Sequence, residues 1–268
     1  MISIKSTNNK KIKEYLFVSK SKKIRKEKGL CVLEGLRLIT DAFQFGVTFK
    51  QIFISEETLK KLEAIKSPLL SFRPIATLNK TLAKKLSLVQ NSQNIFAIVK
   101  KPENAKFNEL RNDQKILVLI ELNDPGNVGT LIRSAAAFDF TTIILANCCD
   151  VYNPKLIRSS MSCLFKTKIL ECSINEFKNW LNRTTNLQTI ASLPSVNKWQ
   201  KKCSYNSING CVLLVGNEAN GLPDELSKLC RFQATLTMQP FVESLNAAVA
   251  GSVLMFELSQ NKLCLFET

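Results

Sequence analysis

The sequence predicts an α/β protein of two domains, a small α/β sandwich followed by a larger domain built on a mostly parallel sheet. Two observations predict this class. Apolar segments of strand length alternate with segments of helical periodicity in both halves of the 268-residue chain. A polar segment that contains proline, residues 100–104, separates the halves and is typical of a linker. We therefore expect domains over residues 1–102 and 103–268.

In the first half, apolar periodicity and glycine stops define short elements. The spacing of Leu36, Ile39 and Phe43 predicts a helix that stops before Gly46. Residues 5–28 are rich in lysine and arginine, which fits either a solvated helix face or an arm that follows phosphates, and the charge density favours the arm. We expect strands over 31–35, 49–54 and 95–99, and helices over 5–28, 36–45, 56–65 and 76–86.

In the second half, the alternation restarts with longer apolar strands. Continuous apolar runs such as residues 116–122 are typical of parallel strands that are buried on both faces. We expect strands over 116–122, 142–146, 187–193, 211–215 and 232–237, and helices over 127–139, 154–161, 174–181, 223–229 and 244–260. This order predicts a parallel sheet with helices on both sides.

Charge is distributed unevenly between the halves. Residues 1–102 hold 21 Lys and Arg against 7 Asp and Glu, a net charge of +14, whereas residues 103–268 hold 16 against 15, a net charge of +1. A proteome-wide lysine bias would raise the charge of both halves. An excess confined to one half instead predicts a polyanionic partner that binds there.

The chain contains nine cysteines and no histidine. Without histidine, common zinc sites lose their nitrogen ligand, and Ser-His or Cys-His nucleophile pairs are excluded. The N-terminus lacks a signal-peptide pattern, and the longest late apolar run, residues 245–256, is too short to span a bilayer. We therefore expect a cytoplasmic protein with reduced thiols, no metal and no membrane association.

Three polar loops follow apolar strands in the second half, where open α/β sheets bind ligands. In the first, Pro125-Gly126 suits a type II turn, and Asn127 suits the cap of the next helix. The second, residues 216–221, combines glycines with a carboxylate. In the third, Ser244 is the expected N-cap of the last helix. Each loop alone fits an ordinary turn or cap, and none has Walker or G-x-G-x-x-G spacing, which disfavours ordinary nucleotide binding.

Together, the three loops resemble the three motifs of the SpoU family of RNA 2′-O-ribose methyltransferases. The motifs correspond to residues 127–133, 216–222 and 236–250, and the segment around Asn153 resembles the family's connecting segment. In the first half, residues 33–42 resemble the amino-terminal substrate-binding domain of many members, which is similar to a ribosomal-protein fold that binds kinked RNA.

The resemblance implies a C-terminal trefoil knot, S-adenosylmethionine as cofactor and a homodimer formed through residues 103–268. It assigns catalytic roles to Asn127, Arg133, Glu218, Ser244 and Asn246, and cofactor contacts to Gly216, Leu236, Met238, Leu245 and Asn246. The chain departs from the family pattern at Ser162 and Ala219, where glycine is usual, at Thr237, where proline is usual, and at Ala248, where a small hydroxyl residue is usual. These departures concern loop shape and cofactor affinity.

The implied reaction aligns a ribose 2′-hydroxyl with the sulfonium methyl group and removes a proton. A guanidinium is a poor base, so we expect Arg133 to hold the adjacent phosphate and orient the hydroxyl. The proton would then leave through that phosphate or through Arg133 itself. Asn127 and Asn246 would hold Arg133 and the ribose, and Glu218 would either orient Arg133 or act as the base. Ribosomal RNA is the preferred substrate. The alternatives are transfer RNA, methylation of a base, and a non-catalytic RNA-binding or ribosome-assembly protein on the same fold.

Overall fold

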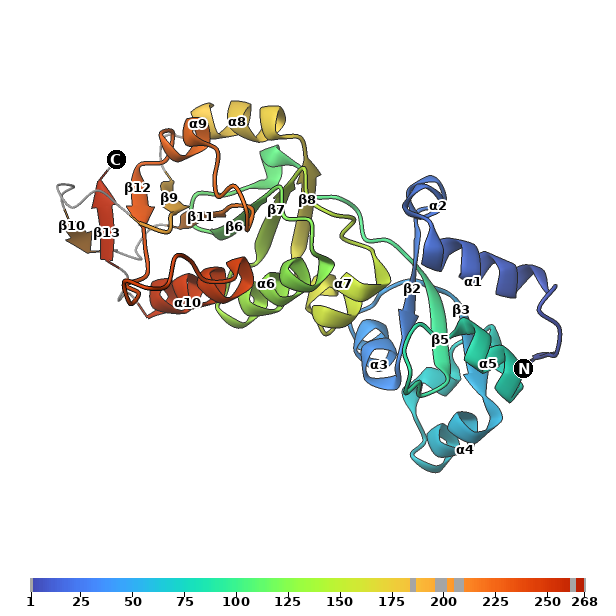
Figure 1. The fold of residues 1–268 in the computed structure, drawn as a ribbon. Helices are drawn as coiled ribbons and strands as arrows, with labels where there is room; N and C mark the ends of the chain where they lie inside the picture. The colour runs from blue at the N-terminus through green and yellow to red at the C-terminus, as the bar shows by residue number, and fades with distance from the viewer. Residues whose placement is uncertain (1, 184–186, 196–201, 205–209, 261–263, 268) are drawn as a thin grey trace. The chain divides into compact units, whose positions relative to one another are not determined.

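The computed structural model describes residues 2–183, 187–195, 202–204, 210–260 and 264–267 (Figure 1). The chain divides into two compact units. Unit 1 comprises Met1–Glu103 together with Tyr152–Phe165, and unit 2 comprises Asn104–Val151 and Lys166–Thr268. Each unit has its own sheet, which confirms the predicted pair of α/β folds. No helix among the described residues is long and apolar enough to cross a membrane.

Unit 1 is a mixed sheet with helices packed against it. Its strands are β1 (Ile2–Ile4), β2 (Leu30–Glu34), β3 (Phe49–Ser55), β4 (Ile75–Leu78) and β5 (Ile95–Lys100), and its helices are α1 (Lys10–Lys20), α2 (Lys22–Lys28), α3 (Leu36–Gln44), α4 (Glu56–Ala64), α5 (Lys80–Leu86) and α7 (Pro154–Ser159). The strand order is β1-β4-β3-β5-β2, and β5 runs antiparallel to both of its neighbours. Alternate strand residues such as Val32 and Phe96 pack with Tyr15 of α1 and Leu82 of α5 in one buried cluster.

Two of the predicted elements of unit 1 were wrong. Residues 5–28 form two helices, because the Ser21 hydroxyl accepts a hydrogen bond from the backbone N–H of Ile24 and so starts α2. The buried guanidinium of Arg25 donates to the carbonyls of Val18 and Ser19, which end α1. The expected helix over 76–86 begins only at Lys80, since β4 pairs with both β1 and β3.

Unit 2 is built on the predicted parallel sheet. Its strands are β6 (Lys115–Ile120), β7 (Thr142–Ala146), β8 (Lys168–Cys172), β9 (Gln188–Ser192), β10 (Lys202–Ser204), β11 (Cys211–Val215), β12 (Phe232–Ala234) and β13 (Cys264–Glu267), and its helices are α6 (Pro125–Ala137), α8 (Ile174–Arg183), α9 (Asp224–Ser227) and α10 (Ala247–Ser259). The order is β10-β13-β12-β9-β11-β6-β7-β8. The strands from β12 to β8 are parallel, and β13 is antiparallel to its neighbours. A mostly parallel sheet is thus confirmed.

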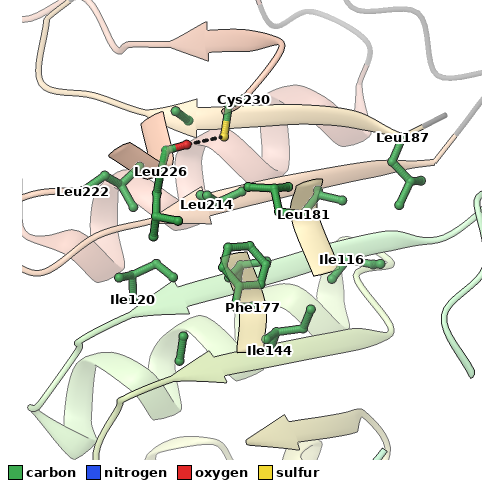
Figure 2. Packing of buried hydrophobic residues seen from close by; sticks show 14 of the residues in the cluster. Ile116, Ile120, Ile144, Phe177, Leu181, Leu187, Leu214, Leu222, Leu226 and Cys230 are labelled. Carbon is green, nitrogen blue, oxygen red and sulfur yellow. Dashed lines mark hydrogen bonds between the residues drawn. The ribbon is translucent and has the colours of Figure 1, made fainter. Parts of the chain in front are cut away.

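The sheet of unit 2 carries helices on both faces. On one face, Phe177 and Leu181 of α8 and Leu226 of α9 pack on strand residues that include Ile116 and Leu214 (Figure 2). On the other face, α10 packs beside α6 and against β11 (Figure 1). All these strand residues are fully buried, which explains why the sequence of each strand is apolar without alternation.

Residues 152–165 pack with unit 1 although unit 2 precedes and follows them in the chain. Leu156 and Ile157 of α7 are fully buried. The Ser162 hydroxyl donates to Oδ2 of Asp41 on α3 over 3.1 Å. Ser162 has a φ of +71°, the left-handed region that favours the glycine usual at this position, so the hydrogen bond accompanies a strained backbone.

Candidate active site

The first loop of the site begins α6 earlier than the sequence indicated. Pro125 and Gly126 lie in the first turn of the helix rather than in a type II turn, and Asp124 is the N-cap. Its carboxylate accepts from the backbone N–H of Asn127 over 3.2 Å. Proline is favoured at the first helical position because its missing N–H would have no partner there. Asn127 therefore does not cap the helix, and its side chain is available for the site.

The side chain of Asn127 joins the three loops. Its Nδ2 donates to Oε1 of Glu218 over 2.5 Å, and its Oδ1 accepts from Nδ2 of Asn246 over 3.2 Å. Asn246, not Ser244, is the N-cap of α10, and its Oδ1 accepts from the backbone N–H groups of Ala248 and Val249. The structure thus brings Asn127, Glu218 and Asn246 into one chain of hydrogen bonds that begins at the backbone of α10.

This chain fixes which way each amide faces. The Oδ1 of Asn246 is occupied by backbone donors, so only its Nδ2 can face Asn127. The Oδ1 of Asn127 must then face Asn246, and its Nδ2 must face Glu218. The N-terminus of a helix, which favours negative charge, therefore orients a carboxylate two side chains away.

The second loop folds back on itself at Gly216. Asn217 and Gly221 exchange backbone hydrogen bonds, and Gly221 has a φ of +67°. A Cβ atom on Gly216 would lie 2.3 Å from the carbonyl carbon of Gly221, so glycine is required for this close approach. Ala219 is not among the positive-φ residues of the described chain, and its N–H donates to Oδ1 of Asn217. Alanine at this departure from the family pattern is therefore free of backbone strain.

Asn217 is a positioning residue that the sequence did not single out. Its Oδ1 accepts from the backbone N–H groups of Ala219 and Asn220, and its Nδ2 donates to the carbonyl of Glu121 over 2.8 Å. Glu121 directly follows β6 and has a φ of +56°. One amide thus shapes the second loop and ties it to the end of the neighbouring strand. An asparagine after Gly216 is a typical turn residue, which is why its long-range bond was not foreseen.

A pocket of about 430 Å³ lies beside these loops. The predicted cofactor residues Gly216, Leu236, Met238 and Leu245 all line it, and so do Glu218 and Ser244. Asn127, Arg133 and Asn246 are not among its lining residues. The lining also includes Ser192, the last residue of β9, and Leu193 and Pro194 directly after it, none of which the resemblance assigned to the site.

Arg133 is not a member of the hydrogen-bonded chain that joins Asn246, Asn127 and Glu218. It is exposed on α6, and for the described residues the structure gives it no hydrogen bond or ion pair. Asn127 bonds to Asn246 and to Glu218, and neither asparagine bonds to Arg133. The guanidinium is therefore available for an anion, whereas Glu218 is held by an amide.

Three cysteines of unit 2 lie partly or fully buried in or beside the sheet. Cys148 follows β7 and donates to the carbonyl of Leu119 over 3.2 Å, and burial raises the pKa of its thiol to about 12. Burial likewise raises the thiol pKa of Cys172 and of Cys230 to about 12. A raised pKa disfavours the thiolate form, so these thiols lack the character of activated nucleophiles. Among the described residues, no group of three or more Cys, Asp or Glu side chains is arranged to hold a metal ion.

Unit 1 contains a second feature that the sequence analysis did not foresee. The buried carboxylate of Glu34 accepts hydrogen bonds at 2.8 Å from the Ser87 hydroxyl, the Leu88 N–H and the Ser92 hydroxyl. The side chain of Gln93 accepts from the N–H of Leu36 at the start of α3. The loop between α5 and β5 is thus fixed beside α3. An open cavity of about 1300 Å³ borders this loop. Its lining includes the lysines Lys60, Lys80 and Lys84, the carboxylates Glu56 and Glu57, and the amides Asn79, Gln90, Asn91 and Asn94.

Comparison with known proteins places both units. Residues 114–256 match the SpoU rRNA Methylase family, and residues 9–97 match the MRM3-like substrate binding domain. An uncharacterized tRNA/rRNA methyltransferase of Synechocystis is 29% identical over 95% of this chain and 92% of its own. The 23S rRNA (guanosine(2553)-2′-O)-methyltransferase of Bacillus subtilis is 26% identical over 96% of this chain and 99% of its own.

Solved structures share the fold over the whole chain. A crystal structure of an RNA 2′-O ribose methyltransferase aligns with a TM-score of 0.80 and 27% identity, and it covers 97% of this chain and 99% of its own. The AdoMet-bound rRNA methyltransferase of Sinorhizobium meliloti aligns with a TM-score of 0.79 and 24% identity, over 96% of this chain and 97% of its own. With its three motif loops gathered at one edge of a parallel sheet, and with a family match over more than half of its length, this chain belongs to the SpoU rRNA methylase family.

Proposed function

We propose that this protein transfers a methyl group from S-adenosylmethionine to a ribose 2′-hydroxyl of ribosomal RNA. The observation that carries the proposal is the hydrogen-bonded chain from Asn246 through Asn127 to Glu218, beside the 430 Å³ pocket. This chain links one polar side chain from each of the three family motifs. Turns with a purely structural role would not need such a link between them. The Bacillus subtilis relative, which is named as a 23S rRNA 2′-O-methyltransferase, supports the same reaction.

The pocket has the character of a small-molecule site. Its volume falls within the range of about 300–1,000 Å³ typical of such sites. Apolar side chains, including Leu236, Met238 and Leu245, alternate with the backbone of two loops, and the close approach at Gly216 leaves no room for a Cβ. These residues would hold S-adenosylmethionine, with Asn246 at the border. When bound, the cofactor supplies a methyl group on a positively charged sulfur.

The chain's own residues would align the ribose and take its proton. Glu218 is held by Asn127 and is exposed, so its carboxylate can accept a hydrogen bond from the 2′-hydroxyl. Arg133 would hold the phosphate next to the target ribose through its planar fork. Ser244, which lines the pocket, would contact the ribose. Alignment of this kind supplies much of the rate enhancement of a displacement reaction.

Two routes for the proton remain chemically distinct, and an experiment separates them. If Glu218 accepts the proton, Glu218→Gln should abolish the acidic limb of the pH–rate profile along with most of the activity. If the phosphate held by Arg133 accepts it, Glu218→Gln should lower the rate but keep the profile's shape. We favour Glu218, because the bond from Asn127 orients its carboxylate, and a glutamine could accept the same bond without taking the proton.

The RNA contact is proposed for the first unit. Residues 1–102 carry the net charge of +14, and residues 9–97 match a substrate-binding domain. Residues 103–268 would carry the methyl transfer. Ribosomal RNA is preferred over transfer RNA because the Bacillus subtilis relative acts at an assigned position of 23S rRNA. A non-catalytic role would leave the chain from Asn246 to Glu218 without a purpose.

Three further features belong to the proposal. Val249, Val253 and Phe256 of α10 lie on one side of the helix and are 51%, 38% and 43% exposed, which supports a homodimer through unit 2. A trefoil knot near the C-terminus would account for the return of the chain from β12 to α10, which packs beside β11 and α6. A cytoplasmic location fits the free cysteines and an RNA substrate.

The test is a map of ribose methylation in RNA from wild-type cells and from cells that lack this protein. The expected result is the loss of one or a few ribose methyl groups in ribosomal RNA, restored by the wild-type protein and not by Glu218→Gln. Loss of a ribose methyl group from transfer RNA would show that transfer RNA, and not ribosomal RNA, is the substrate. Loss of a base methyl group, or no loss at all, would refute the proposed reaction.

A further inference from the structure

The third loop presents an aromatic ring to solvent. The backbone N–H of Val242 donates to the carbonyl of Gln239 over 2.9 Å, which closes a turn with Pro240 and Phe241 at its two central positions. Proline fixes the backbone at the first of these positions. Phe241 is 85% exposed, more than any other large apolar side chain of the described residues. The ring is therefore displayed on a closed turn rather than packed.

This turn lies at the pocket. Met238, just before the turn, and Glu243 and Ser244, just after it, all line the pocket, whereas Phe241 does not. The described residues that line the pocket include no aromatic side chain. Phe241 is therefore the aromatic group that the third loop itself brings next to the reaction site.

We propose that Phe241 stacks on an unpaired base of the RNA substrate, either the base of the methylated nucleotide or that of its neighbour. This inference rests on the proposed function. A ribose that reaches the pocket brings its own base and the adjacent bases to the loop that carries Phe241. RNA-binding proteins recognise splayed bases by stacking them on aromatic side chains, and every base has a face that a phenyl ring can cover. Phe241 is thus a substrate-positioning residue.

The turn explains why the ring is ready for such a contact. A phenyl group held on a closed turn loses little conformational freedom when a base covers it. Glu218, Glu243 and Asp224 make the lining of the pocket acidic, so the pocket itself offers little attraction to phosphates. Stacking provides affinity that does not depend on charge at this end of the substrate.

The test begins with substitutions at Phe241 in the full-length protein. Phe241→Ala and Phe241→Leu should raise the KM for RNA by about 5- to 100-fold, the range expected for loss of one base stack. Phe241→Trp should stay within about 2-fold of the wild type, because it keeps an aromatic face. The Kd for S-adenosylmethionine, measured by calorimetry, should not change in any variant. If Phe241→Leu kept the KM for RNA as close to the wild-type value as Phe241→Trp does, the contact would be a general apolar one and the stacking role would be refuted.

A cycle between protein and RNA then tests the contact directly. Short RNAs centred on the mapped nucleotide are made with an abasic site at the target or at either neighbour. At the stacked position, the abasic RNA should raise the KM of the wild type as much as Phe241→Ala does, and the two changes together should cost no more than either alone. If the effects of Phe241→Ala and of the abasic site on KM multiplied at all three positions, the ring and the base would act independently and the proposal would be refuted.

Two controls separate this inference from the proposals on which it rests. If the wild-type protein methylates no ribose, the proposed function is refuted and the stacking role falls with it. If the wild type is active and Phe241→Ala has an unchanged KM for RNA, only the stacking role is refuted. Sedimentation of Phe241→Ala should match the wild type, since a change in oligomeric state would assign the ring to a subunit contact instead. Leu229→Ala, which shortens a 38% exposed apolar side chain of unit 2 that does not line the pocket, should leave the kinetics unchanged.

Discussion

Asn246 has two roles in the structure, and a pair of substitutions separates them. Its Oδ1 caps α10 through Ala248 and Val249, and its Nδ2 donates to Asn127. Asn246→Ala removes both contacts. Loss of an N-cap costs about 1 kcal/mol, which lowers the Tm of a unit of this size by roughly 2–4 °C. The methyl-transfer rate should fall as well, because Asn127 loses the partner that fixes its orientation.

Asn246→Asp keeps the cap and removes the donor. Aspartate is as good an N-cap as asparagine, so the Tm should stay close to that of the wild type. Its carboxylate cannot donate to Oδ1 of Asn127. If the Asn127 amide turns to donate to residue 246 instead, its oxygen faces Glu218, so one of the two bonds is lost in either orientation. Misorientation of a catalytic group costs on the order of 10²-fold in rate.

The assay combines thermal unfolding of the full-length protein with single-turnover methyl transfer. Asn246→Ala should lower both the Tm and the rate, and Asn246→Asp should lower the rate alone. Ser173→Ala is the matched control, because Ser173 forms a reciprocal cap with Glu176 at the start of α8 in the same unit. It should lower the Tm and leave the rate unchanged. A rate for Asn246→Asp within about 3-fold of the wild type, well short of the loss expected from misorientation, would refute the role of the chain.

Four other predictions test the remaining parts of the proposal. Arg133→Ala should abolish methyl transfer and leave the calorimetric Kd for S-adenosylmethionine within a few-fold, and Arg133→Lys should be nearly as inactive, because a point charge does not replace a planar fork; near-normal transfer would remove Arg133 from the site. Val253→Glu should convert the dimer into monomers in sedimentation equilibrium, and an unchanged mass would place the interface elsewhere. Gly251→Ala should destabilise unit 2 by about 1–3 kcal/mol in urea unfolding, since its Cβ would lie 2.6 Å from a methyl carbon of Leu131; an unchanged midpoint would show that Leu131 moves aside freely. RNA affinity measured by filter binding should fall with salt at a slope near −0.7 per neutralised phosphate on single strands, and a flat response would detach the charge of residues 1–102 from RNA binding.

The strands and the ligand edge of unit 2 could be predicted because parallel strands leave strong local signals. Continuous apolar runs marked β6, β7 and β11, and the polar loops that follow β6, β11 and β12 marked the site. The start of α6 could not be settled, because Pro125-Gly126 suits a turn and a helix N-terminus equally well. Asp124 decides between them by its bond to the Asn127 N–H. That difference also changes the role of Asn127 from a cap to a link between loops.

Elements that depend on distant partners were missed. Ile75–Leu78 contains residues that also form helices, and pairing with β1 and β3 makes it a strand. The short edge strand β8 has only two buried residues, too few for a clear pattern. The bond from Asn217 to the carbonyl of Glu121 joins residues almost one hundred positions apart. Periodicity and spacing carry no information about such contacts.

Because residues 152–165 pack with unit 1, the two units cannot be separated by a simple truncation. The chain crosses between the two units after residues 103, 151 and 165, so no single cleavage separates them cleanly. A fragment that begins at residue 104 would retain Leu156 and Ile157 without the β2 surface that buries them, and Ser162 without Asp41. Such a fragment should aggregate or be clipped by proteases within this segment. A modular exchange of the RNA-binding unit, in the laboratory or in evolution, therefore has to replace two separate stretches of sequence together.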